Sequence, residues 1–373
     1  MVNFLKTSLK NKILCILLAV ILFGLSGFAV LRPKDEYSAS ERRLLSQLPA
    51  VSVKTLLSGA FMSEFEEYTQ DQFPLRESWR TLKALVNKYF YNKSENNGIY
   101  ELDGYFADGQ YPLDEKSVAY AVKIFNSVYD RYFADGDYNV YFSLIPDKNY
   151  FMQQQAKQLC IDYDRYKEIV KDELSRFSYI EIFDTLTLDS YYKTDTHWRQ
   201  EKIRSTADVL LTAMHAKPSD STDYEIKELS VPFYGVYYGQ AALPVDAETI
   251  YYADSTVFGN VSVYDHENRR EISVYDFEKG SGKDPYEFFL SGPLSLVTIE
   301  NPDAETDREL FVFRDSFGSS IAPYFIDSYA KITLIDIRYL ASAMVGNFVD
   351  FTDGADVLFL YSTMVLNASN VLK

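Results

Sequence analysis

The chain opens with its longest apolar stretch, residues 13–31, which hold no charged side chain. At about 1.5 Å per residue, a helix of this length nearly spans the hydrocarbon core of a bilayer. Three lysines within residues 6–12 precede the stretch, and positive charge there predicts a cytoplasmic N-terminus with the remainder outside the membrane. We therefore interpret residues 1–34 as a cytoplasmic tail and an uncleaved transmembrane signal anchor. We favour this over a cleaved signal peptide and over a buried core helix.

Residues 35–114 combine a polar connection, two amphipathic stretches and a short aromatic segment. The stretches 53–70 and 76–92 have helical spacing of apolar residues and are separated at Pro74, which interrupts the period. Residues 97–109 alternate aromatic with turn residues, as a small hairpin does. This region predicts a juxtamembrane helical neck followed by a hairpin.

From residue 115 to the end of the chain, short apolar strands alternate with amphipathic helices. The predicted strands are 139–146, 179–184, 309–316, 331–336 and 356–361, and the predicted helices are 115–131, 149–176, 198–215, 317 to about 327 and about 339–350. Such alternation indicates an α/β domain with a mainly parallel sheet of about five strands. Residues 217–305 interrupt it with Tyr-rich and Thr/Val-rich strand candidates, which predict a β-rich insertion. Parallel sheets bind ligands at the carboxyl ends of their strands, so functional residues are sought there.

Composition narrows the function classes. A hydrophobic fraction of 47% and an aromatic fraction of 16% are typical of a folded globular protein. The net charge of −17 would repel a nucleic-acid backbone, so nucleic acid is not expected as a partner. The two cysteines, Cys15 in the apolar stretch and Cys160 in a predicted helix, are not expected to form a disulfide.

Ser316 is the outstanding nucleophile candidate, because it directly follows an apolar strand and precedes a predicted helix. A serine at such a turn has backbone N–H groups nearby that point to where an oxyanion would form. The alternative is that Ser316 or Asp315 is only the N-cap of the helix, a role for which both residue types are preferred.

Asp195 and His197 lie in the loop after another predicted strand, within the segment YYKTDTHW. A serine nucleophile needs a base within hydrogen-bond reach, and the base needs a carboxylate that fixes its tautomer. His197 could accept the Ser316 proton through one ring nitrogen while Asp195 binds the other. The alternative is a capping or core histidine with Asp195 as an N-cap. A metal site is less favoured, because the three histidines lie in three different segments and no CxxC pair exists.

Four further residues are candidates for contact with the substrate or the oxyanion. Lys148 follows the first core strand, although a solvated turn and cap is its simpler interpretation. Gly235 would allow close backbone approach as an oxyanion donor, or it belongs to an ordinary tyrosine-rich turn. Arg338 could hold an acidic substrate, orient the serine loop or form a surface ion pair. Tyr324, in the helix after Ser316, completes the set.

Together these segments resemble a known family. The anchor and the motifs DQFPLR, NGIYELDGY, IPDKNYF, YYKTDTHW, FYGVYYG and FRDSFGSS, in this order, look like the DHHW protein family. That family is related to the SGNH-hydrolase-like domain of the alginate O-acetyltransferases of the AlgJ and AlgX type. Here Thr196 stands where the family name has its first histidine, so a role of that histidine does not transfer.

The resemblance implies a three-layer, flavodoxin-like SGNH fold outside the membrane, with Ser316, His197 and Asp195 as a catalytic triad. In the related systems, a membrane O-acyltransferase of the MBOAT type passes acetyl groups to such a domain, which transfers them to a polysaccharide. We therefore expect a membrane-anchored, extracytoplasmic carbohydrate O-acetyltransferase or acetylesterase that uses no cofactor or metal. A cell-surface polysaccharide and an MBOAT-type donor are its expected partners. The alternative is a noncatalytic cell-envelope protein that binds or assembles polysaccharide, for which the 31 tyrosines offer stacking surfaces.

Overall fold

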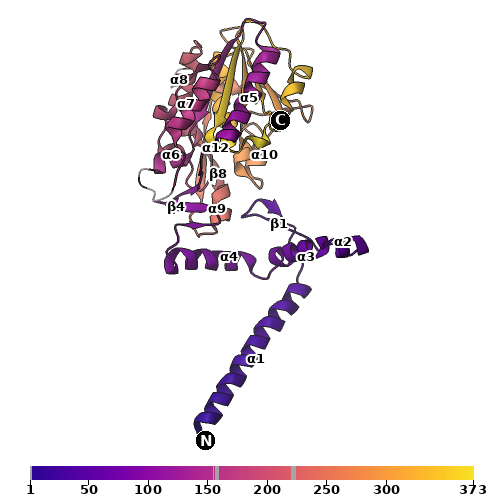
Figure 1. Ribbon diagram of the computed structural model, residues 1–373. Coiled ribbons are helices and arrows are strands. Elements are labelled where there is room, and N and C mark those ends of the chain that lie inside the picture. The colour runs from indigo at the N-terminus through magenta and orange to yellow at the C-terminus, as the bar shows by residue number, and fades with distance from the viewer. Residues whose placement is uncertain (1, 154, 156–158, 220–223) are drawn as a thin grey trace. The chain divides into compact units, whose positions relative to one another are not determined.

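The computed structural model describes residues 2–153, 155, 159–219 and 224–373 (Figure 1). The chain divides into two compact units. The first comprises the chain up to Asn96 together with Ala242–Pro244, and the second comprises Asn97–Ala241 and Val245–Lys373.

The first unit begins with the long helix α1, Val2–Leu31. Its segment Leu9–Leu31 is long and apolar enough to cross a membrane, as the sequence predicts. A signal sequence near an N-terminus has the same length and composition, so this property suits either an anchor or a signal sequence.

Short elements follow α1 in the first unit. They are the paired strands β1 (Tyr37–Ser38) and β2 (Arg43–Leu44), the helices α2 (Val53–Leu57), α3 (Ala60–Asp71) and α4 (Arg76–Leu85), the π-helical turn η1 (Val86–Phe90) and strand β3 (Glu95–Asn96). Both predicted helical stretches are present. The first is interrupted at Gly59, whose φ of 78° lies in the left-handed region that interrupts a right-handed helix.

The second unit contains an eight-stranded sheet with the order β11-β10-β12-β14-β13-β15-β6-β7. Five strands are parallel: β6 (Asn139–Ile145), β7 (Ser178–Tyr179), β13 (Glu309–Arg314), β14 (Lys331–Ile335) and β15 (Asp356–Ser362). The predicted parallel sheet is therefore confirmed. The sheet is larger than predicted, because three antiparallel strands from the β-rich stretch extend it: β10 (Ser262–Asp265), β11 (Arg270–Ile272) and β12 (Leu296–Glu300).

Helices cover both faces of this sheet and make three layers. Along β13, Leu310 and Val312 belong to one hydrophobic core, while Phe311 and Phe313 belong to the other. The first core includes residues of α8 (Arg204–Ala213) and α11 (Phe317–Ile321), and the second includes residues of α5 (Glu115–Tyr132) and α7 (Tyr163–Glu173). Because successive side chains of a strand point to opposite faces, a continuous apolar strand is buried on both sides, as the fold class predicts.

The remaining elements of the second unit are short. The predicted hairpin is formed by β4 (Ile99–Leu102) and β5 (Tyr105–Asp108), and β8 (Glu225–Phe233) pairs with β9 (Glu248–Asp254) in a separate hairpin. The short helices are α6 (Lys148–Met152), α9 (Val236–Ala241), α10 (Phe277–Gly280) and α12 (Thr363–Asn367). The 3₁₀ turns are η2 (Phe183–Thr185), η3 (Leu188–Ser190), η4 (Gln200–Lys202), η6 (Thr256–Gly259), η7 (Pro285–Phe288), η8 (Ala322–Ser328), η9 (Ser342–Asn347) and η10 (Ser369–Val371).

Several predicted boundaries were wrong. The single helix expected over 149–176 is two helices, α6 and α7, because Asp162 caps a new start by accepting the Arg165 N–H. Cys160 consequently lies outside a helix. Residues 154 and 156–158 of the expected helix are outside the described residues. The strand expected over 179–184 ends at Tyr179, and the helix expected near 339–350 is the 3₁₀ turn η9.

Candidate active site

Ser316 occupies the turn between β13 and α11, at the carboxyl edge of the parallel strands. Its backbone is helical, with φ −62° and ψ −23°, but its side chain makes no capping bond to α11. Asp315, fully buried, fixes the turn instead: one oxygen accepts the Phe317 N–H at 3.0 Å and the other accepts the Ser362 N–H at 2.8 Å. The serine loop is thereby bound to the end of β15, and the Ser316 hydroxyl is directed elsewhere.

Asp195 and His197 lie in a closed loop and not at the start of a helix. Tyr191 forms an isolated antiparallel bridge with Trp198, and the Tyr192 N–H donates to His197 O at 3.1 Å. The carboxylate of Glu248 also holds this loop, because it accepts hydrogen bonds from the N–H groups of Lys193 and Thr194 at 2.7 Å each. The helical turns begin only at η4 and α8, so a helix-capping role for Asp195 is wrong.

The structure brings Ser316, His197 and Asp195 together, although 119 residues separate the serine from the histidine. His197 Nε2 lies 2.8 Å from Ser316 Oγ, and His197 Nδ1 lies 2.6 Å from Asp195 Oδ1. Asp195 is 1% exposed, whereas Ser316 and His197 are partly exposed. The arrangement matches what nucleophilic attack by a serine needs: a base on the hydroxyl and a buried carboxylate on the far side of the ring.

Gly235 supports the carboxylate rather than an oxyanion. Its N–H donates to Thr194 Oγ1 at 2.9 Å, so the role of oxyanion donor that the sequence suggested does not fit. The next N–H, from Val236, donates to Asp195 Oδ2 at 2.8 Å. A Cβ atom at position 235 would lie 2.2 Å from Thr194 O and 2.3 Å from Asp195 N, so only glycine permits this approach of the two backbones.

His197 is held by residues that the sequence did not reveal as functional. Its ring stacks on Tyr286 with centroids 3.9 Å apart and an interplanar angle of 11°. The Tyr286 hydroxyl is 2.8 Å from Ser320 Oγ, which also accepts the Trp198 indole N–H at 2.8 Å. Tyr286 comes from the irregular β-rich stretch, where no pattern marked it. Ser320 was only one of three serines in the FRDSFGSS motif.

Lys148 lies beneath the His197 loop and not on the rim. It is 2% exposed, and its Nζ donates to Tyr192 O at 2.9 Å and to Lys193 O at 3.0 Å. Burial lowers the pKa of Lys148 to about 7, although the charge of Asp195 acts in the opposite direction. The solvated turn considered for Lys148 is wrong, and direct contact with a bound substrate does not suit so buried a side chain.

The side chains of Arg338 and Tyr324 bond to groups other than Ser316. Arg338 forms an ion pair with Asp336, with Nη2 to Oδ2 at 2.6 Å, which raises the pKa of Arg338 despite its burial. Asp336 Oδ2 also lies 3.6 Å from Nη1 of the buried Arg314, which immediately precedes the serine loop. The Tyr324 hydroxyl donates to Gln200 O at 3.0 Å inside the core, so a substrate contact is not supported.

Thr196, His215 and His266 are not part of the arrangement of Ser316, His197 and Asp195. Thr196 Oγ1 is 3.0 Å from Met364 Sδ. His266 Nε2 bonds to Thr298 Oγ1, and burial lowers the pKa of His266. His215 has a φ of 55° just after α8. Among the described residues, no group of three or more His, Cys, Asp or Glu side chains could hold a metal ion.

The sheet order, the three layers and the serine turn define the chain as an α/β protein of the SGNH-hydrolase-like fold. No family model matches the chain, and no curated protein matches it. Solved structures do match. A DHHW family protein from Eubacterium siraeum aligns with a TM-score of 0.57 and 20% identity, covering 74% of this chain and 94% of that chain.

PatB1 of Bacillus cereus, solved with a sulfonyl adduct, aligns with a TM-score of 0.56 and 16% identity, covering 72% of this chain and 95% of that chain. The O-acetyltransferase domain of Pseudomonas putida AlgJ aligns with a TM-score of 0.46 and 10% identity, covering 72% and 92%. The first two matches confirm the predicted resemblance to the DHHW family, and at their identities they establish the fold.

Proposed function

We propose that this protein is a membrane-anchored carbohydrate O-acetyltransferase or acetylesterase that works through an acetyl-Ser316 intermediate. The observation that carries the proposal is the chain of short contacts from Ser316 Oγ to His197 and from His197 to Asp195, at 2.8 and 2.6 Å. A protein that only binds polysaccharide does not need a serine, a histidine and a buried aspartate hydrogen-bonded in this order. The choice of an acetyl group rests on the motif resemblance to the DHHW family and the alginate O-acetyltransferases.

In the first half-reaction, the Ser316 hydroxyl attacks the acyl carbon and its proton moves to His197 Nε2. The new oxygen–carbon bond makes a tetrahedral oxyanion, which collapses as the donor's oxygen leaves with the proton from His197. Asp195 keeps the other ring nitrogen protonated and stabilises the imidazolium. Because the N–H groups of Phe317 and Gly318 donate to Asp315, the Ser316 N–H is the proposed oxyanion donor.

In the second half-reaction, a hydroxyl group gives its proton to His197 Nε2 and attacks the acetyl carbon. The bond to Ser316 Oγ breaks, and the serine recovers its proton from the imidazolium. A sugar hydroxyl makes the protein a transferase, and water makes it an esterase, so the two activities differ only in which acceptor reaches the acetyl-serine.

The test is to mix the full chain, in detergent or lipid nanodiscs, with an activated acetyl ester, quench it with acid and measure its intact mass. One acetyl group per chain is expected, and it should map to Ser316. Ser316→Ala should carry none. Ser319→Ala is the matched control, because this neighbouring serine is nearly buried and should leave labelling unchanged. Equal labelling of the Ser316→Ala variant, or none of the native chain by any of several donors, would refute the covalent mechanism.

Adding candidate oligosaccharides to the acetylated chain separates the two activities. Acetyl loss that depends on the sugar and yields an acetylated sugar supports transfer, whereas loss to water alone supports hydrolysis.

The proposed location is the outer side of a cell membrane, with α1 as a single-pass anchor and an MBOAT-type protein as acetyl donor. It is supported by the apolar segment Leu9–Leu31 and by Lys6, Lys10 and Lys12, which precede its uncharged stretch 13–31. Protease added to intact cells that express the chain should digest the part after α1. Protection until the membrane is opened would reverse the proposed topology.

A further inference from the structure

Helix α4 exposes its apolar face. Trp79 and Leu82 lie within α4, Leu75 directly precedes it and Val86 begins η1. Their spacings of four, three and four residues place them along one side of this segment. Their exposed fractions range from 38% to 64%. Aromatic residues continue the exposed surface where the helix ends: Tyr89, Phe90 and Tyr91. In a globular protein such a stripe normally faces the core, so its exposure needs an explanation.

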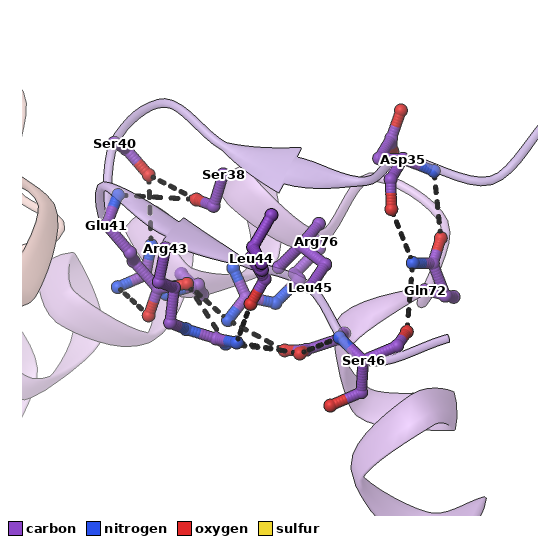
Figure 2. A network of polar contacts seen from close by, with 12 residues as sticks. Asp35, Ser38, Ser40, Glu41, Arg43, Leu44, Leu45, Ser46, Gln72 and Arg76 are labelled. Atoms are coloured by element: carbon purple, nitrogen blue, oxygen red, sulfur yellow. Dashed lines mark hydrogen bonds and ion pairs between the residues drawn. The ribbon is translucent and has the colours of Figure 1, made fainter. Parts of the chain in front are cut away.

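The opposite side of α4 is less exposed: Ala84 is buried, and Arg76 and Arg80 bind Glu41 in the turn between β1 and β2 (Arg76 and Glu41 are shown in Figure 2). Arg76 Nη2 lies 2.6 Å from Glu41 Oε2, and Arg80 Nη2 lies 3.2 Å from Glu41 Oε1. Asp71 joins the same cluster through Arg43, whose hydrogen bonds lower the pKa of Asp71 to about 2. These charged contacts hold α4 in the orientation that turns its apolar stripe outward.

The start of α4 is bonded to the residues that follow the apolar helix α1. Arg32 Nη2 donates to Gln72 O at 3.2 Å. The Gln72 side chain then accepts the Asp35 N–H at 3.1 Å and donates to Asp35 O at 2.8 Å (Figure 2). Because Leu9–Leu31 is the candidate membrane span, these bonds place the turn before α4 at the level where the span ends.

The charge of this segment differs from that of the chain. Residues 75–93 contain five basic residues and one acidic residue, whereas the net charge of the whole chain is −17. Arg76 and Arg80 are paired with Glu41, so the other three basic residues, Lys83, Lys88 and Lys93, are the ones that matter for a lipid surface. Basic residues beside an apolar helical face are typical of helices that lie on anionic membranes, and Trp and Tyr are enriched at the level of lipid headgroups.

We propose that α4 is an interfacial membrane helix: its apolar stripe lies among the upper acyl chains of a bilayer that carries anionic headgroups. The first unit then binds the lipid surface a second time, beside α1, and lies flat against it. The occupant of the stripe is lipid, since the stripe adjoins the candidate span and Lys83, Lys88 and Lys93 of the same segment supply the positive charge that anionic headgroups attract.

Trp79 provides a natural probe for the test, because the second tryptophan, Trp198, is fully buried in the other unit. The full chain is placed in vesicles of phosphatidylcholine and phosphatidylglycerol, with or without bromine atoms on the acyl chains. Brominated lipids should abolish the emission that Trp79 contributes, defined as the difference between the native chain and Trp79→Phe. Iodide in the water should leave that emission unchanged.

The double variant Leu82→Ser with Val86→Ser should restore Trp79 emission in brominated vesicles while α1 keeps the chain membrane-bound. Ser78→Gln, on the same exposed side, is the matched control and should stay quenched. Circular dichroism and Trp198 emission verify that each variant folds. Trp79 emission that is equally bright in both kinds of vesicle overturns the proposal. If iodide quenches it, the stripe lies in water; if iodide does not, a second copy or another part of the chain covers it.

Discussion

Replacing Gly235 by alanine should disable the candidate site while the fold persists. The added Cβ would lie 2.2 Å from Thr194 O, whereas ordinary contact begins at 3.4 Å, so the two segments must separate by about 1 Å. That movement breaks the bond from the Val236 N–H to Asp195 Oδ2 and shifts the loop that carries His197. A misplacement of about 1 Å can cost roughly 10²-fold in rate, and overpacking typically costs about 1–3 kcal/mol of stability.

The assay compares hydrolysis of an activated acetyl ester, and the rate of labelling by a sulfonyl fluoride, between the native chain and Gly235→Ala. We expect both rates to fall about 100-fold, with a free energy of unfolding lower by about 1–3 kcal/mol in urea. Gly259→Ala is the matched control, because a Cβ there meets no atom within 4 Å and its φ lies outside the left-handed region. Its rates should equal those of the native chain.

Native rates in Gly235→Ala would refute the reasoning, because they would mean that the close approach of the two backbones does not position Asp195. A variant that fails to fold is recognised by the loss of its unfolding transition. Gly235→Ser would then repeat the test with the same added atom and a side chain of different polarity.

Three further predictions concern the residues around the histidine. Burial lowers the pKa of Lys148 to about 7 from an ordinary value near 10.5. Between these two pH values the unfolded chain binds more protons than the folded chain, so the free energy of unfolding increases as the pH rises through this range. Urea titrations at pH 7 and 10 should show this gain lost in Lys148→Met; an equal gain in the variant would exclude the linkage. Tyr286→Leu removes the ring stacked on His197 and should lower the rate about tenfold, whereas Tyr286→Phe keeps the ring and should retain activity; equal rates in both variants would argue against a positioning role for the ring. Ser320→Ala leaves the Trp198 indole N–H without its acceptor and should lower the free energy of unfolding by about 1–3 kcal/mol, so an unchanged urea midpoint would contradict it.

Local patterns predicted the parallel part of the sheet because its strands are apolar on both faces. Residues 310–313 and 357–360 form uninterrupted apolar runs, and runs of this length between turns have few alternatives to a buried strand. One boundary error has a clear cause: the 149–176 stretch keeps a helical period, but the Asp162 cap starts a new helix, and a period alone does not reveal such an interruption.

Ser316 was predictable because it stands at a strand-to-helix boundary that the sequence marks. Asp195 and His197 were predictable as an Asp and a His two positions apart, although the loop that holds them does not start a helix as expected. Their neighbours were not predictable. Tyr286 belongs to an irregular stretch whose path depends on the whole fold. Lys148 was interpreted as part of a solvated turn, whereas in the structure its side chain is buried and donates to the carbonyl groups of Tyr192 and Lys193.

By itself, the sequence determined the apolar N-terminal helix, the alternating α/β order and the residue types available for acyl chemistry, because these depend on local periodicity and on residue identity. Only the tertiary structure decided that Ser316 meets His197 across 119 residues, that Gly235 braces the Asp195 loop, and that α4 turns its apolar face outward. Those outcomes depend on which backbone segments approach one another, and that is set by packing of the entire chain rather than by any local pattern.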